Sequence, residues 1–173
     1  MASMIADVAH EFRRYKGLAD QAMAELSDEA FFRRPGEVVN PVALIVKHVA
    51  GNLTSRWTDF LTTDGDKPTR NRDGEFTLTP ADTRTSLLAA WEGGWKALFD
   101  ALAGLTEADL NKVVTIRGEP HRVQQALLRS VNHTIYHVGQ ILYLARWLNP
   151  GGTWLTIPPG QSRTYQPETG YLK

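Results

Sequence analysis

The sequence predicts an all-α fold, a single four-helix bundle over residues 1–173. Four segments, residues 4–24, 41–61, 80–103 and 122–148, repeat apolar residues at spacings of three and four, which is the period of an amphipathic helix. Clusters of proline, glycine and other turn-forming residues separate the segments. A chain of 173 residues also suits one domain with one sizeable core. We therefore expect one bundle with long connections.

Apolar periodicity predicts the first helix, and a capping signal marks the start of the second. In residues 4–24 the apolar side chains recur at helical spacing, which predicts the first amphipathic helix. The second helix is expected to begin at Asn40-Pro41, because asparagine is a good N-cap and proline at the first helical position loses only an N–H without a partner. His48 stands at the edge of the apolar face of this helix.

Glycine residues are informative in the connection after the second helix and in the third helix. Two turn motifs with little to bury, Asp64-Gly65-Asp66 and Asn71-Arg72-Asp73-Gly74, predict a loop over residues 62–75. The third helix is expected to begin at Thr79-Pro80, again an N-capping residue followed by proline at the first helical position. Gly93-Gly94 weakens that helix by about 1 kcal/mol per glycine relative to alanine, so either the backbone approaches a neighbour closely there or the helix is locally loose.

The last third of the chain combines an extended arm, a helix and a tail. Val113 to Ile116 is β-branched and alternating, which predicts a short strand or extended arm before the last helix. That helix, residues 122–148, is the longest. The irregular tail, residues 150–173, is too rich in proline to be helical, and we expect it to dock on the bundle or on a second subunit.

Composition excludes several classes of function. Lysine plus arginine equals aspartate plus glutamate, 19 against 19, which disfavours nucleic acid as a partner. The absence of cysteine removes disulfides, thiolate nucleophiles and cysteine metal ligands. No window is apolar enough for a membrane span or a secretory signal, so we expect a soluble, cytoplasmic protein.

Two histidines in the last helix predict a metal site. His133 and His137 are four residues apart, so their side chains share one face, and the apolar residues of that face point inward. His48 would supply a third ligand from the second helix, which is how bundles build metal sites. The alternative is that these are core histidines hydrogen-bonded to their neighbours. Asn52 and Gln140 stand near the histidines in sequence and can hydrogen-bond a ligand ring or a substrate.

The residues around these histidines do not identify a general base. Thr134-Ile135-Tyr136 separates the pair, with no glutamate beside the first histidine, so a zincin mechanism is not supported. Three neutral imidazoles would leave a divalent ion with open coordination positions, as in catalytic sites. Tyr136 is a further candidate for substrate contact.

The motifs Asn40-Pro41-Val42-Ala43-Leu44-Ile45-Val46-Lys47-His48 and Asn132-His133-Thr134-Ile135-Tyr136-His137-Val138-Gly139-Gln140-Ile141 resemble the DinB/YfiT-like superfamily of metal-binding four-helix bundles. Ile116-Arg117-Gly118-Glu119 and the tail from Leu155 to Ser162 narrow the resemblance to a largely uncharacterised branch. The resemblance implies zinc or nickel held by His48, His133 and His137, and a homodimer.

The resemblance also implies the class of activity. Members of the superfamily include S-transferases that use a low-molecular-weight thiol, such as bacillithiol or mycothiol, and others were named as metal-dependent hydrolases. We therefore expect a metal-dependent enzyme that acts on a small-molecule substrate. The alternative is a non-catalytic metal-binding or stress-response module that works through dimer or tail contacts.

Overall fold

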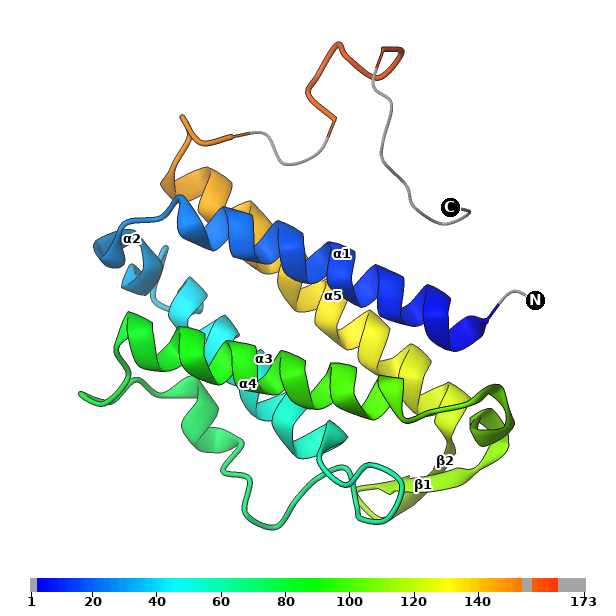
Figure 1. Cartoon of the computed structure of the whole chain (residues 1–173). Coiled ribbons are helices and arrows are strands. Elements are labelled where there is room, and N and C mark those ends of the chain that lie inside the picture. Colours follow the sequence, from blue (N-terminus) through cyan, green and yellow to red (C-terminus); the bar gives the residue numbers. More distant parts are fainter. Residues whose placement is uncertain (1–2, 154–156, 165–173) are drawn as a thin grey trace.

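A computed structural model describes residues 3–153 and 157–164 of the chain, and most of them are helical (Figure 1). The α-helices are α1 (Met4–Ala24), α2 (Asp28–Phe32), α3 (Val42–Trp57), α4 (Arg84–Ala103) and α5 (Val123–Leu148). Two 3₁₀ helices, η1 (Asp73–Phe76) and η2 (Glu107–Asn111), and a hairpin of β1 (Val113–Ile116) and β2 (Glu119–Arg122) lie in the connections. In the described residues, no helix is long and apolar enough to cross a membrane.

The four long helices pack in pairs around one core. α1 lies along α5 and α3 lies along α4, and α3 also contacts α5 (Figure 1). Large aromatic side chains fill the core, among them Phe12, Trp57, Trp91 and Trp95, each at most 2% exposed. Two of the indole N–H groups bond to neighbouring helices: Trp57 Nε1 donates to Ser130 Oγ at 3.3 Å, and Trp91 Nε1 donates to Asp20 Oδ1 at 2.8 Å. α3 and α5, which contain the three candidate histidines, are therefore fixed against each other by packing.

The two adjacent glycines of α4 have different surroundings. A Cβ atom on Gly94 would lie 2.9 Å from the carbonyl oxygen of Ala50 in α3, whereas a Cβ on Gly93 would meet no atom within 4 Å. Gly94 therefore permits a close approach of α4 to α3. Of the two explanations that the sequence allowed, close approach applies to this position.

The structure corrects the predicted start and end of α3. The helix begins at Val42 with Pro41 as its N-cap, and no side chain caps it, so the predicted Asn40 cap is wrong. Pro41 is extended, with ψ of 163°, and its carbonyl accepts the first hydrogen bond of the helix. The helix ends at Trp57 rather than at residue 61, because Asp59 has a positive φ of 47° and its carbonyl starts a new turn.

The start of α4 is also later than predicted. Thr79 and Asp82 form a separate turn, in which Asp82 Oδ2 accepts from the Thr79 N–H at 2.7 Å and from its hydroxyl at 2.9 Å. The helix itself begins at Arg84, where Thr83 and Ser86 form a reciprocal capping box. The short-range hydrogen bonds of Asp82 therefore stabilise a turn where the sequence predicted the first turn of the helix.

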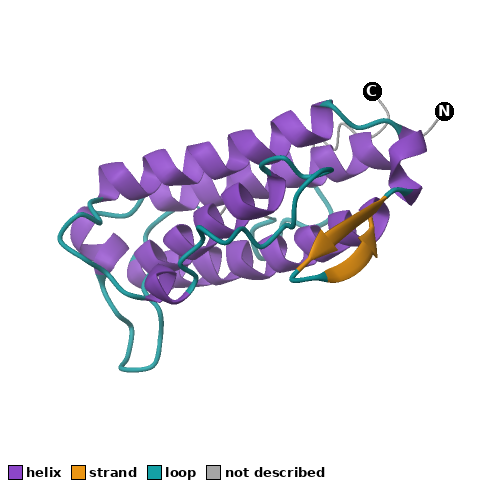
Figure 2. Ribbon diagram, turned by 90° about the horizontal axis from the view of Figure 1, so that it is seen from below, coloured by secondary structure: helices purple, strands orange, loops and turns teal. Residues whose placement is uncertain are grey.

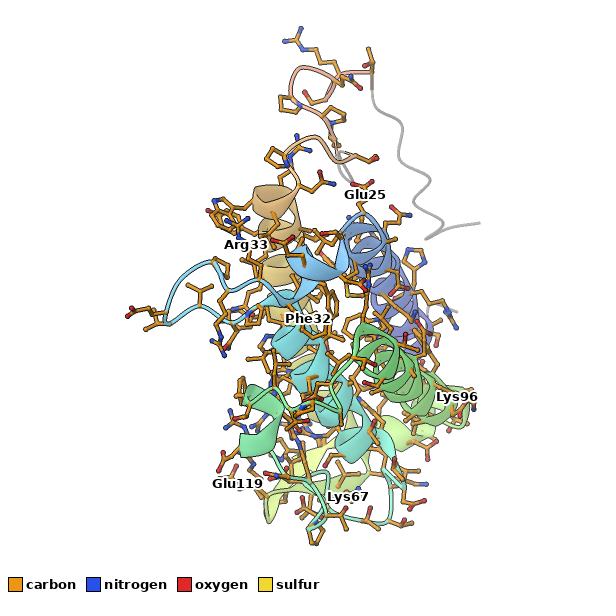
Figure 3. All side chains as sticks on the ribbon, turned by 90° about the vertical axis from the view of Figure 1, so that its left-hand side faces the viewer. Glu25, Phe32, Arg33, Lys67, Lys96 and Glu119 are labelled. Carbon is orange, nitrogen blue, oxygen red and sulfur yellow. The ribbon has the colours of Figure 1, made fainter. Side chains whose placement is uncertain are left out.

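The long loop between α3 and α4 is anchored to the hairpin. β1 and β2 are antiparallel, and the turn between them has positive φ at Arg117 (57°) and Gly118 (75°). Asp64 of the loop accepts hydrogen bonds from both of these N–H groups, at 2.9 and 2.8 Å. Lys67 of the loop and Glu119 of the hairpin consequently lie at the same end of the molecule (Figure 3), and Figure 2 shows the hairpin beside the helices. This anchoring fixes the loop beside α3.

The beginning of the C-terminal tail is attached to the end of α1. The N–H of Thr153 donates to Glu25 Oε2 at 2.8 Å, and Asn149 Nδ2 donates to the Glu25 carbonyl at 3.2 Å. Glu25 lies at the end of the molecule opposite the hairpin (Figure 3). The expected docking of the tail concerns in part residues 154–156 and 165–173, which lie outside the described residues.

Candidate metal centre

The structure brings His48, His133 and His137 together. One ring nitrogen from each lies within 4.8 Å of those of the other two. His48 comes from α3, and the other two come from successive turns of α5. The Nε2 atoms of His48 and His133 are 3.3 Å apart. Two ligands on a tetrahedral zinc ion with Zn–N bonds of about 2.0–2.1 Å have nitrogens roughly 3.4 Å apart, so this spacing suits a shared ion.

The second nitrogens of two rings are hydrogen-bonded to acceptors. His48 Nδ1 lies 2.8 Å from Glu75 Oε2, and His137 Nδ1 lies 2.8 Å from Gln140 Oε1. A carboxylate and an amide oxygen accept, so in the neutral rings Nδ1 has the proton and Nε2 presents a lone pair. Metal-binding histidines are oriented by acceptors in this way.

His133 has no such acceptor. Its Nδ1 is buried and has no hydrogen-bond partner among the described residues. Its Nε2 lies 3.3 Å from His48 Nε2, and at most one proton can lie between these two nitrogens. A cation between the three rings would satisfy all three lone pairs together. The donor set, nitrogen only, therefore fits a divalent transition metal.

Burial and charge keep two of the rings neutral. Burial above all, with repulsion from Arg56 and Arg70 and from a neighbouring histidine whenever that ring is protonated, lowers the pKa of His133 to about 3. Burial also lowers the pKa of His137, although its hydrogen bond to Gln140 opposes the shift. Neutral imidazole is the form that binds metals, so at neutral pH no proton has to leave these two rings before an ion binds.

Glu75 and Arg70 belong to the site, and the sequence analysis missed both. The Glu75 side chain is 8% exposed, and the Arg70 guanidinium holds its two oxygens through Nε at 2.7 Å and Nη2 at 2.8 Å. Burial raises the pKa of Glu75, but the hydrogen bonds from His48 and Arg70 outweigh it, so the net shift is downward. Glu75 is thus a carboxylate that orients His48.

Gly51 of α3 makes room for Glu75. This glycine was the feature of the sequence that could have indicated a group packed against α3. A Cβ on Gly51 would collide with Glu75 Oε1 and would lie 2.8 Å from its Cδ. Gly51 is inside a helix, three residues after His48, and helix interiors disfavour glycine. Its position indicates that another group must lie against this face of α3. The sequence did not identify that group as Glu75, because residues 62–75 were predicted to be an exposed loop.

The remaining predicted residues surround the histidines. Asn52 lines a cavity of about 200 Å³ that His48 and His133 also line. Tyr136 is 63% exposed, and its ring packs edge-on against His137 with centroids 4.9 Å apart. Gln140 holds the His137 ring, as described above. The cavity gives a substrate access to two of the three ligands.

Comparisons with known proteins give a family and a fold. A family model described as "Protein of unknown function (DUF1572)" matches residues 1–161, and the chain belongs to this family. A crystal structure of a conserved protein of a locus from Enterococcus faecalis aligns with 87% of this chain and 99% of its own, with a TM-score of 0.65 and 14% sequence identity. No curated protein matches the chain. The structural likeness supports a shared fold.

Proposed function

We propose that this member of the DUF1572 family is a metal-dependent enzyme that holds one divalent ion, zinc or nickel, through His48, His133 and His137. The observation that carries the proposal is the convergence of the three ring nitrogens within 4.8 Å, with two rings oriented by Glu75 and Gln140. Such an ion, when bound, lowers the pKa of a coordinated water or keeps a substrate thiol as its thiolate.

We also propose that the fold is a four-helix bundle of the DinB/YfiT-like kind. The pairing of α1 with α5 and of α3 with α4, together with the contact between α3 and α5, supports this arrangement. Its histidines then come from two facing helices, which is how bundle proteins build metal sites.

Transfer of a small thiol is the reaction that the surroundings favour. No carboxylate lines the cavity within the part of the chain that the structure describes, and Glu75 is engaged by His48 and Arg70. A thiolate nucleophile needs no base from the protein when its sulfur attacks carbon and the leaving group departs with its electron pair. Asn52 and Ser130 then provide the neutral polar contacts of the cavity.

Metal analysis tests the first part of the proposal. Untagged protein should contain about one zinc or nickel ion per chain by elemental mass spectrometry, and the His133→Ala and His137→Ala variants should lose it. His10→Ala, which removes a histidine from α1, is the matched control and should keep the metal. Circular dichroism must show that the variants remain helical. Absence of metal from the wild type, even after incubation with zinc and nickel, would show that the histidines are a structural polar cluster.

A thiol assay tests the enzymatic part. Metal-loaded protein is mixed with cysteine or glutathione and the electrophile monochlorobimane, and the fluorescent adduct is measured. Turnover that disappears in His48→Ala and persists in His10→Ala is the expected result. If the protein binds its metal and turns over neither these thiols nor a panel of ester and amide substrates, the non-catalytic metal-binding module becomes the better interpretation.

A further inference from the structure

The cavity beside the histidines is lined by an unusual concentration of arginine. Five guanidinium side chains face it from α3, the long loop, the hairpin turn and α5; they are Arg56, Arg70, Arg72, Arg117 and Arg129. The other lining residues are His48, Asn52, Ser130 and His133. The cavity thus has positive charge on several sides and opens onto two of the candidate metal ligands.

Carboxylates neutralise only part of this charge. Arg70 pairs with Glu75 and Asp66, and Arg117 pairs with the same Asp66 at 2.7 Å. Within residues 3–153 and 157–164, no carboxylate forms an ion pair with Arg56, Arg72 or Arg129, which are the other three guanidiniums of the cavity. The charge left over is positive.

Arg56 is the clearest sign of a missing partner. It is 7% exposed, and its Nε donates to the Gly65 carbonyl at 3.3 Å. No described residue accepts a hydrogen bond from its two terminal nitrogens. Burial, followed by repulsion from Arg129 and Arg70, lowers its pKa to about 10. These terminal nitrogens face the cavity, and a largely buried guanidinium without an ion-pair partner is costly. The folded chain thus keeps a guanidinium in place whose natural complement is an anion.

We propose that this cavity binds the oxyanion of a small-molecule substrate, a carboxylate or a phosphate, next to the three histidines. Guanidinium groups match the geometry of both oxyanions and donate paired hydrogen bonds to them. Arg56 contacts the anion from the floor of the cavity, and Arg129 and Arg72 contact it from the rim. This inference rests on the proposed function only where it names a metal ion as the neighbour of the anion. The arginines form the anion site whether or not the histidines bind a metal.

A small molecule is favoured over a nucleic acid. The cavity of about 200 Å³ admits a group of a few heavy atoms, and the five arginines line this one cavity. The chain as a whole has a net charge of zero, which gives no extended field for a polyanion.

Isothermal titration calorimetry of metal-free protein with inorganic phosphate and with succinate tests the proposal. At low salt, one of the two probes should bind at one saturable site, and added sodium chloride should weaken the binding. Binding of phosphate alone or of succinate alone identifies the kind of oxyanion. Arg129→Gln should reduce the affinity about tenfold or more, the effect of losing one charge-assisted hydrogen bond. Arg14→Gln, which removes the same charge from α1, should bind like the wild type.

Two further results keep the anion site separate from the metal site. Arg56→Gln should abolish binding of the anion, and circular dichroism should show that this variant keeps its helical fold. If Arg56→Gln unfolds, the affinity of Arg129→Gln tests the anion site instead. A protein that binds phosphate or succinate but no metal would refute the proposed function and keep the anion site. Absence of saturable binding of both probes, in metal-free and metal-loaded protein, or equal binding by wild type and Arg129→Gln, would overturn the anion site. Tighter binding of an oligonucleotide than of either probe would also overturn it.

Discussion

Replacing each of the two adjacent glycines of α4 by alanine should have clearly different effects on stability. Gly93→Ala adds a methyl group to an open surface, whereas Gly94→Ala directs it at the Ala50 carbonyl of α3. Both changes gain about 1 kcal/mol of helix propensity. The propensity gain therefore cancels when the two variants are compared with each other, and the difference between them measures the contact with α3.

The size of that difference follows from the geometry. The new Cβ of Gly94→Ala would lie 2.9 Å from the Ala50 oxygen and 3.2 Å from its Cα, about half an ångström closer than ordinary contact. Backbone cannot rotate away as a flexible side chain can, so the two helices must separate. Overpacking of this kind costs about 1–3 kcal/mol. Gly94→Ala should consequently be less stable than Gly93→Ala by about 1–3 kcal/mol.

Urea unfolding, followed by the tryptophan fluorescence of the core and by circular dichroism, measures both variants against the wild type. Gly93→Ala should raise the midpoint, and Gly94→Ala should have a lower midpoint than Gly93→Ala with an unchanged m-value. Thermal melting should separate the variants by at least about 2–4 °C, the shift expected for 1 kcal/mol in a chain of this size. Equal stability of the two variants would refute the close approach of α4 to α3.

The other predictions concern the site and its anchoring loop. Glu75→Gln should weaken metal binding about 10- to 100-fold, because it replaces the carboxylate that orients His48; competition with a chelator measures this, and unchanged affinity would exclude the orienting role. Metal at 100 times its Kd should stabilise the fold by about 2.7 kcal/mol, and the rise in melting temperature should vanish on chelation and be absent in His137→Ala. Hydrogen bonds from the backbone N–H groups of Gly118 and Asp66 lower the pKa of Asp64 in the folded protein. The ionised carboxylate therefore stabilises the fold at pH values above the unfolded pKa of about 3.9. This contribution is lost as the pH falls through the lower pKa of the folded state. Asp64→Asn should reduce the loss of stability between pH 5 and pH 3, measured as the urea midpoint, and an equally steep loss in the variant would contradict this.

The sequence predicts the long helices well because their signal is the periodicity of buried residues. α1 spans Met4–Ala24, the residues expected for it, and Val113–Ile116 forms the expected strand. Helix starts were harder, because Asn40-Pro41 and Thr79-Pro80 have capping residues that the structure uses differently. Pro41 itself is the N-cap of α3, and Asp82 closes a turn with Thr79 before α4 begins. Several local hydrogen-bonding patterns compete at such positions, and the tertiary contacts decide between them.

Two residues of the site, Glu75 and Arg70, could not be predicted because they lie in the irregular connection between α3 and α4. The histidines repeat at helical spacing, so their shared face is visible in the sequence. Glu75 and Arg70 are in a segment whose turn motifs predicted exposure, yet both side chains are at most 8% exposed. The same connection is held by Asp64, which accepts hydrogen bonds from the hairpin turn more than fifty residues later. A contact of that sequence separation has no periodic signature.

The net charge of the chain gave no indication of the arginine-lined cavity. The chain has 19 basic and 19 acidic residues, and this balance argued against a field for nucleic acid. The balance holds for the whole molecule, but it says nothing about one cavity, which five arginines from positions 56 to 129 line. Surface charges farther away than about 8–10 Å are screened by salt, while charges around a cavity act on a bound group through less water. An anionic substrate is therefore compatible with a neutral protein, and selection by charge would take place inside the site rather than at its surface.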